Sequence, residues 1–165
     1  MIKRNIDSIG RPDAKQIEIA EKALIGIILL ENNLMDKIVY SGLDYRHFNS
    51  KFGVLYFIIR NLFTNSTDDK PFKVDTVILY EMLKTKPLLV PDYNISAVEL
   101  SMLSQDAPIS SNMILTASIC IHTIMTGYVF RELNRSIKGL ENCITECNCV
   151  TGNIDEMLLN VKQTN

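Results

Sequence analysis

The stretch from Asp13 to Leu30 reads Asp-Ala-Lys-Gln-Ile-Glu-Ile-Ala-Glu-Lys-Ala-Leu-Ile-Gly-Ile-Ile-Leu-Leu. Pro12 followed by Asp13 is a typical helix start. Apolar residues then recur at intervals of three and four, which is the period of one helical face, at Ile17, Ala20, Leu24, Ile27 and Ile28. The second half of the stretch is apolar on nearly every side. We therefore expect this helix to lie at the centre of the core.

Shorter helices are expected after it, each bounded by capping or turn-forming residues. The patterns cover residues 34–40, 50–63, 76–84 and 95–103. Ser50 and Asp75 are the expected N-caps of the second and third of these helices. A longer helical pattern then starts at Ile109-Ser-Ser-Asn112 and reaches about Cys147.

The C-terminal part is expected to form a helical hairpin. Thr151-Gly-Asn153 has the composition of a turn, and a short antiparallel arm follows with Ile154, Leu158 and Val161 on one face. Such a hairpin has little core of its own. Its apolar face therefore requires a partner, either the head of the same chain or another copy of it.

These patterns together predict an all-α fold, a compact helical head followed by a C-terminal helical hairpin. The expected organisation is a flexible tail at residues 1–11, the helical head at 12–108, and the long helix with its short antiparallel arm at 109–165. With 47% apolar and 22% charged residues, the 165-residue chain has an ordinary globular composition.

Charge and hydropathy exclude two classes of partner. The formal net charge is −2, so no clustered positive field is available for a phosphate backbone, and direct nucleic-acid binding is not expected. The longest apolar stretch is Ala23–Leu30, far shorter than the roughly 20 residues that span a membrane. No membrane contact and a cytoplasmic location are therefore expected.

No catalytic, cofactor-binding or metal-binding residues are predicted. The seven glycines do not form a phosphate-binding Gly-x4-Gly-Lys-Ser/Thr loop. His122 lies two residues from Cys120, so on a helix the two side chains diverge by about 200° and do not form a catalytic dyad. His47 is expected to be a surface or capping residue.

The four cysteines leave two interpretations open. Cys143, Cys147 and Cys149 cluster near the C-terminus, and Cys120 lies earlier in the chain. Their spacing differs from the paired Cys-x2-4-Cys of structural zinc sites, which favours reduced thiols in a reducing cytoplasm. A zinc site or a thiol-based enzyme is the alternative, which a metal assay and thiol blocking would test.

Several segments resemble one protein family in order and spacing. Ile19–Leu30 resembles the E-A-E-x-A-V-L-G-x-x-L-L opening of the N-terminal domain of DnaB-type replicative DNA helicases, with Gly26 at the family's glycine. Pro71-Phe-Lys-Val-Asp75-Thr-Val-Ile-Leu79 is similar to the family's P-I-D-x-V-T-L, and Ile109–Asn112 to its S-A-A-N. Tyr128–Leu133 is similar to its x-x-x-R-x-L. The resemblance covers residues 12–163.

The resemblance implies a non-catalytic domain. The ATPase of such helicases lies in a separate domain, while the N-terminal domains pair through their hairpins in a hexameric ring and receive the C-terminal domain of primase. The partners implied are other copies of this chain, primase, and the helicase ATPase domain of a longer protein. The alternative is a free-standing helical regulator that mimics this domain and binds helicase or primase.

Partner contacts are expected on the long helix. The residues are Ile121, Ile124, Met125, Tyr128 and Leu133, with Arg131 as a polar anchor. The alternative left open is that these side chains pack on their own chain.

Overall fold

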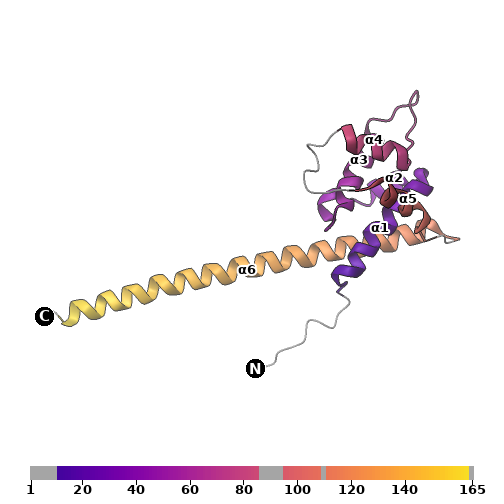
Figure 1. Cartoon of the computed structure of the whole chain (residues 1–165). Helices are drawn as coiled ribbons and strands as arrows, with labels where there is room; N and C mark the ends of the chain where they lie inside the picture. The colour runs from indigo at the N-terminus through magenta and orange to yellow at the C-terminus, as the bar shows by residue number, and fades with distance from the viewer. Residues whose placement is uncertain (1–10, 86–94, 109–110, 164–165) are drawn as a thin grey trace. The chain divides into compact units, whose positions relative to one another are not determined.

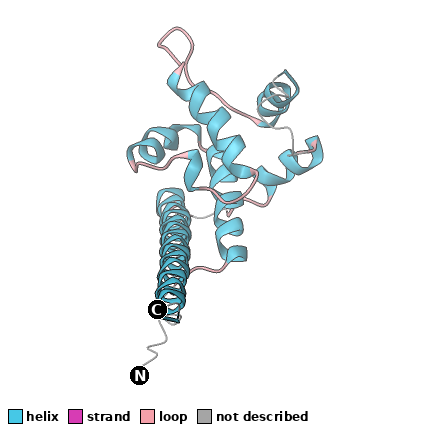
Figure 2. Ribbon diagram, turned by 90° about the vertical axis from the view of Figure 1, so that its left-hand side faces the viewer, coloured by secondary structure: helices cyan, strands magenta, loops and turns pink. Residues whose placement is uncertain are grey.

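A computed structural model describes the backbone of residues 11–85, 95–108 and 111–163, and the side chains of these as far as residue 145. Most of the described residues lie in helices. Within the described ranges the only β-type pairing is an isolated antiparallel bridge between Thr67 and Lys70. The described ribbon consists of helices and loops (Figures 1 and 2). The prediction of an all-α protein is therefore confirmed. The tail predicted at residues 1–11 lies outside the described residues except for Arg11.

The helices follow the predicted order. In chain order they are α1 (Ala14–Leu30), the short 3-10 helix η2 (Asn32–Leu34), α2 (Met35–Tyr40), the 3-10 helix η3 (Tyr45–His47), α3 (Phe52–Thr64), α4 (Thr76–Thr85), α5 (Ala97–Gln105) and α6 (Met113–Gln163).

The chain divides into two compact units, a head at residues 1–128 and a distal segment at residues 129–165. The head is larger than predicted, since its boundary was expected after residue 108. It includes the first turns of α6 because Ala117, Cys120 and Ile124 are buried in its core, with exposed fractions of 6% or less. In the distal segment the described backbone belongs to α6.

Helix α1 is the central helix of the head. Its first turn is closed by a capping box, in which Asp13 accepts a hydrogen bond from the Gln16 N–H (2.7 Å) and the Gln16 side chain accepts one from the Asp13 N–H (2.9 Å). Its second half is fully buried at Leu24, Ile25, Ile27 and Ile28. The prediction of a central α1 is confirmed.

A close approach between α1 and α5 depends on Gly26. A Cβ atom added there would lie 2.3 Å from the backbone oxygen of Leu103 and 2.8 Å from the Cβ of Ala107. Because the nearest atom belongs to a helix backbone, it cannot move aside as a flexible side chain does. Glycine at this position therefore sets the distance between the two helices.

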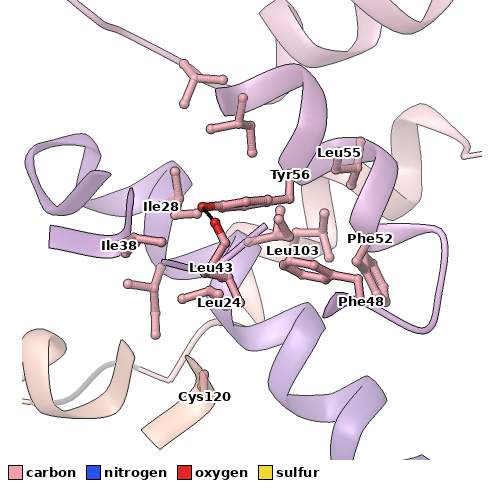
Figure 3. Packing of buried hydrophobic residues seen from close by; sticks show 14 of the residues in the cluster. Leu24, Ile28, Ile38, Leu43, Phe48, Phe52, Leu55, Tyr56, Leu103 and Cys120 are labelled. Carbon is pink, nitrogen blue, oxygen red and sulfur yellow. Dashed lines mark hydrogen bonds between the residues drawn. The ribbon is translucent and has the colours of Figure 1, made fainter. Parts of the chain in front are cut away.

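Aromatic and aliphatic side chains fill the space between α1, α3 and η3 (Figure 3). The rings of Phe48 and Tyr56 stack with centroids 5.0 Å apart. The buried hydroxyl of Tyr56 donates to the backbone oxygen of Leu43 at 3.2 Å. Burial raises the pKa of Tyr56 to about 12, because the ionised phenolate is disfavoured away from water.

One charged side chain is fully buried among the described residues, that of Glu21 in α1. Its carboxylate accepts hydrogen bonds from the backbone N–H of Asn49 (2.5 Å) and from the hydroxyl of Ser50. Ser50 was predicted to cap α3, but the helix begins at Phe52 with Lys51 in the N-cap position. The Ser50 oxygen still accepts from the Phe52 N–H at 3.2 Å, so this serine links α1 to the start of α3.

The predicted C-terminal hairpin is wrong. Helix α6 runs without interruption from Met113 to Gln163, through the turn expected at residues 151–153 (Figure 1). Asn112 caps its start by accepting from the Leu115 N–H at 3.0 Å. The sequence contains no proline after Pro108, and a single glycine costs a helix only about 1 kcal/mol. Gly152 therefore does not end the helix.

Candidate protein-interaction surface

The six predicted contact residues all lie on α6, but their accessibility differs. Ile124 is fully buried. Ile121 and Met125 are half-buried and pack against the core of the head. Leu133, in the distal segment, is 51% exposed, and Arg131 is half-buried. The predicted set is thus divided between the core of the head and the surface of the distal segment.

Ile124 as a partner contact is a wrong prediction. It belongs to the same buried cluster as Cys120, one turn earlier on α6. An apolar side chain without exposed surface cannot be reached by a partner while the head stays folded. For Ile124 the alternative applies, and the residue packs on its own chain.

Tyr128 closes the head against η3. Its ring lies against that of His47, with centroids 4.6 Å apart. His47 Nδ1 in turn accepts a hydrogen bond from the Asp44 N–H at 3.0 Å, which makes His47 a capping residue, as expected. Asp44 also pairs with Arg60 (2.6 Å) and Arg46 (2.8 Å).

The distal segment carries an exposed apolar stripe, of which only the first residue was among the predicted contacts. At about 100° per residue its members fall within an arc of about 60° on one face of the helix. We name as the α6 stripe Leu133, Ile137, Leu140 and Ile144, which are 51%, 52%, 64% and 60% exposed. The signal that would have found the other three is their recurrence in steps of three and four along an unbroken helix.

Charged side chains occupy the other side of this helix. Glu132 and Arg135 form an ion pair at 2.6 Å. Arg135 and Lys138 lie roughly opposite the centre of the stripe. The arrangement is that of an amphipathic helix, except that no other element of the distal segment covers its apolar face within the described residues.

A second accessible apolar surface lies in the head, between α2 and the first turns of α6. It is a groove of about 200 Å³ with one cationic side chain at its edge. Ile121 is the predicted contact residue that lines it. The other principal lining residues are Leu34, Lys37, Ile38, Ile114 and Ala117.

Helix α6 contains a longer uncharged stretch than the one expected to be the longest apolar segment of the chain. No Asp, Glu, Lys or Arg occurs between Asp106 and Arg131, so the uncharged stretch is much longer than Ala23–Leu30. By length and composition, one helix among the described residues, Met113–Thr145, is long and apolar enough to cross a membrane. Mostly buried core helices of soluble proteins meet the same criterion, whereas the apolar window of this helix is 22% buried, with Cys120 and Ile124 in the core of the head.

Two free cysteines have described side chains, the buried Cys120 and the exposed Cys143. Burial raises the pKa of the Cys120 thiol, which keeps it protonated and weakly reactive. Among the side chains described, no group of three or more His, Cys, Asp or Glu is placed to hold a metal ion. The side chains of Cys147 and Cys149 lie outside the described residues.

A scan against protein-family models and searches of curated proteins and solved structures find no match to this chain. The functional argument therefore rests on the chain's own residues. Their most distinctive arrangement is the α6 stripe, an apolar face open to solvent on a long helix. Apolar surface of this kind is typical of a protein-binding site.

Proposed function

We propose that this chain is the non-catalytic N-terminal domain of a DnaB-type replicative DNA helicase, which pairs subunits in the ring and docks primase. The observation that carries the proposal is the exposed α6 stripe. An interaction domain requires an apolar surface left open to a partner. The resemblance supplies the kind of partner.

The residues that carry the resemblance have definite places in the fold. Gly26 allows the close approach of α1 to the backbone of Leu103. Glu21, in the same motif, binds the start of α3 through Asn49 and Ser50. Gly26 and Glu21 therefore have roles in packing the helices together. A motif with a purely structural role is expected in a domain that has no catalysis of its own.

Two further motifs coincide with helix caps. Asp75 accepts a hydrogen bond from the Ile78 N–H at 2.8 Å and so starts α4. Asn112, the last residue of the segment similar to S-A-A-N, starts α6. Two of the segments that carry the resemblance therefore contain a residue that starts a helix.

The docking role is tested by titrating the chain with an isolated primase C-terminal domain in a calorimeter. We expect saturable binding, and its loss when Ile121 is changed to Asp in the groove between α2 and α6. The matched control is Glu18→Gln, a change at an exposed residue of α1. Absence of binding to primase by the unaltered chain would overturn the docking role.

The gene itself separates the helicase domain from a free-standing regulator. If the reading frame continues past Asn165 into a Gly-x4-Gly-Lys-Ser/Thr loop, the chain is part of a helicase. A stop codon after Asn165 would contradict that assignment and favour a regulator that binds helicase or primase.

A further inference from the structure

The α6 stripe follows a strict seven-residue repeat. Phe130, Ile137 and Ile144 are seven residues apart, and so are Leu133 and Leu140. The backbone stays helical to Gln163. The sequence continues both series without a shift in register at positions Cys147, Thr151, Ile154, Leu158 and Val161.

A seven-residue repeat has a particular meaning for a helix. In an ideal straight α-helix, residues seven positions apart differ in direction by about 20°. A helix that only packs on a fixed core therefore does not need apolar residues at strict seven-residue intervals. A strict repeat with alternating steps of three and four keeps one narrow seam facing a second helix that winds around the first. The repeat therefore points to a helical partner of the same length.

The area required agrees with a long pairing of this kind. A Leu or Ile side chain more than half exposed offers on the order of 100 Å², so the four residues of the α6 stripe offer about 400 Å² per copy. A stable interface buries about 800 Å² on each partner. The described part supplies about half of that. The further repeats, on about 20 more helical residues, have the length needed to supply the rest.

The residue types favour one geometry. Ile137 and Ile144 occupy one of the two seam positions of the repeat, and Leu133 and Leu140 occupy the other. β-Branched residues at the first seam position with leucine at the second favour two parallel strands.

The flanking charges agree with a parallel arrangement. In two parallel helices aligned in register, Glu141 of one copy lies beside Ser136 of the other. The two residues are five positions apart in the sequence. Ser136 carries no charge, so this pairing sets no like charges against each other beside the seam.

We infer that two copies of this chain pair through the α6 stripe as a parallel, two-stranded coiled coil. The inference rests on the subunit-pairing part of the proposed function and specifies its surface, its partner and its direction. It replaces pairing between hairpins, because α6 is one continuous helix.

The surface is tested by sedimentation equilibrium of the full chain over a range of concentrations. We expect a dimer whose dissociation constant rises by about 100-fold or more in Leu140→Asp, which places a charge in each half of the seam. Arg135→Asp is the matched control on the opposite face, and it leaves the dimer intact. Leu140 is 64% exposed and lies outside the head, so its replacement leaves the head folded, as circular dichroism would verify.

The direction is tested by disulfide formation. In a background of Cys120→Ala with Cys143, Cys147 and Cys149 changed to Ser, Leu140→Cys is oxidised with glutathione disulfide. Parallel strands bring the two introduced thiols within reach of a disulfide, whose Cα atoms are about 5.5 Å apart. We expect a covalent dimer from Leu140→Cys and none from Arg135→Cys.

The outcomes separate this inference from the proposed function. A chain that stays monomeric at about 0.1 mM overturns the coiled-coil inference. A dimer that tolerates Leu140→Asp, or that crosslinks only through Arg135→Cys, also overturns it. A monomer that uses Leu140 to bind primase, or to bind vesicles of phosphatidylcholine and phosphatidylglycerol, also overturns it. Primase docking is measured separately, so a dimer that ignores primase contradicts the docking role and leaves the coiled coil standing.

Discussion

Glu21 in the middle of α1 accepts a hydrogen bond from the hydroxyl of Ser50, which lies just before α3. The glutamate is fully buried, and it also binds the backbone N–H of Asn49. A buried carboxylate is tolerated only where such donors surround it. This pair therefore fixes the start of α3 on the central helix.

Replacing Glu21 by Ala is expected to destabilise the head by about 3 kcal/mol, because it leaves the Asn49 N–H and the Ser50 hydroxyl buried without their acceptor. The measurement is urea unfolding followed by circular dichroism. Glu18→Ala, at an exposed position of the same helix, is the control and should change the stability by less than about 0.5 kcal/mol. Equal unfolding midpoints for the two variants would contradict the role of Glu21.

Gly26→Ala is expected to destabilise the head by about 2 kcal/mol or more, since the added methyl group meets the Leu103 carbonyl of α5. Thermal unfolding measures the effect. At Gly139, in the distal segment, an added Cβ has no described neighbour within 4 Å. Gly139→Ala should therefore leave the melting temperature of the head unchanged. A Gly26→Ala variant as stable as the original would show that α1 and α5 are not closely packed.

The ion pairs of Asp44 are expected to make the folded head less stable in acid. Burial alone raises the pKa of its carboxyl, but hydrogen bonds from Arg46 and Arg60 and the charge of Arg46 outweigh this and hold the pKa below its ordinary 3.8. Because the folded pKa is depressed, the stabilisation is present above pH 3.8 and is lost as the pH falls below it. Asp44→Asn should cost about 1 kcal/mol at pH 7. The difference from the original chain should shrink below about pH 4. A difference independent of pH would contradict this assignment.

Burial of Tyr56 is expected to make the folded head less stable at high pH. Its pKa is raised by burial from 10.0 to about 12, so the unfolded chain loses the phenolic proton first. Stability that is present below pH 10.0 is therefore lost as the pH rises toward about 12. In Tyr56→Phe this loss is absent, although the Leu43 carbonyl loses its hydrogen bond, at a cost of about 1 kcal/mol. Chemical unfolding at pH 8 to 11 should show the stability of the original chain falling more steeply than that of the variant.

Local sequence features predicted most of the helices because their signals act over a few residues. Asp13 and Asp75 cap their helices as the pattern indicates, since a capping side chain needs only the N–H groups of the next turn. Ser50 departs from this rule. Its hydroxyl is drawn to Glu21, a residue far away in the chain, which no local pattern reveals.

The candidate surface was predicted only in part for a similar reason. Ile124 and Leu133 are both apolar residues of one helix, but one is fully buried and the other is half exposed. Helical periodicity predicts on which face of the helix each residue lies. Whether another element covers that face depends on where the head ends, and the head extends to Tyr128.

The sequence by itself determined that the chain is helical, that α1 and α4 begin after Asp13 and Asp75, and that a long helix follows Asn112. These properties follow from backbone propensity, capping and periodicity, which are local. Only the tertiary structure decided that Ile124 belongs to the core, that Glu21 binds the start of α3, and that the α6 stripe is left uncovered. Those outcomes depend on contacts between residues far apart in the chain, where burial and desolvation decide the energy.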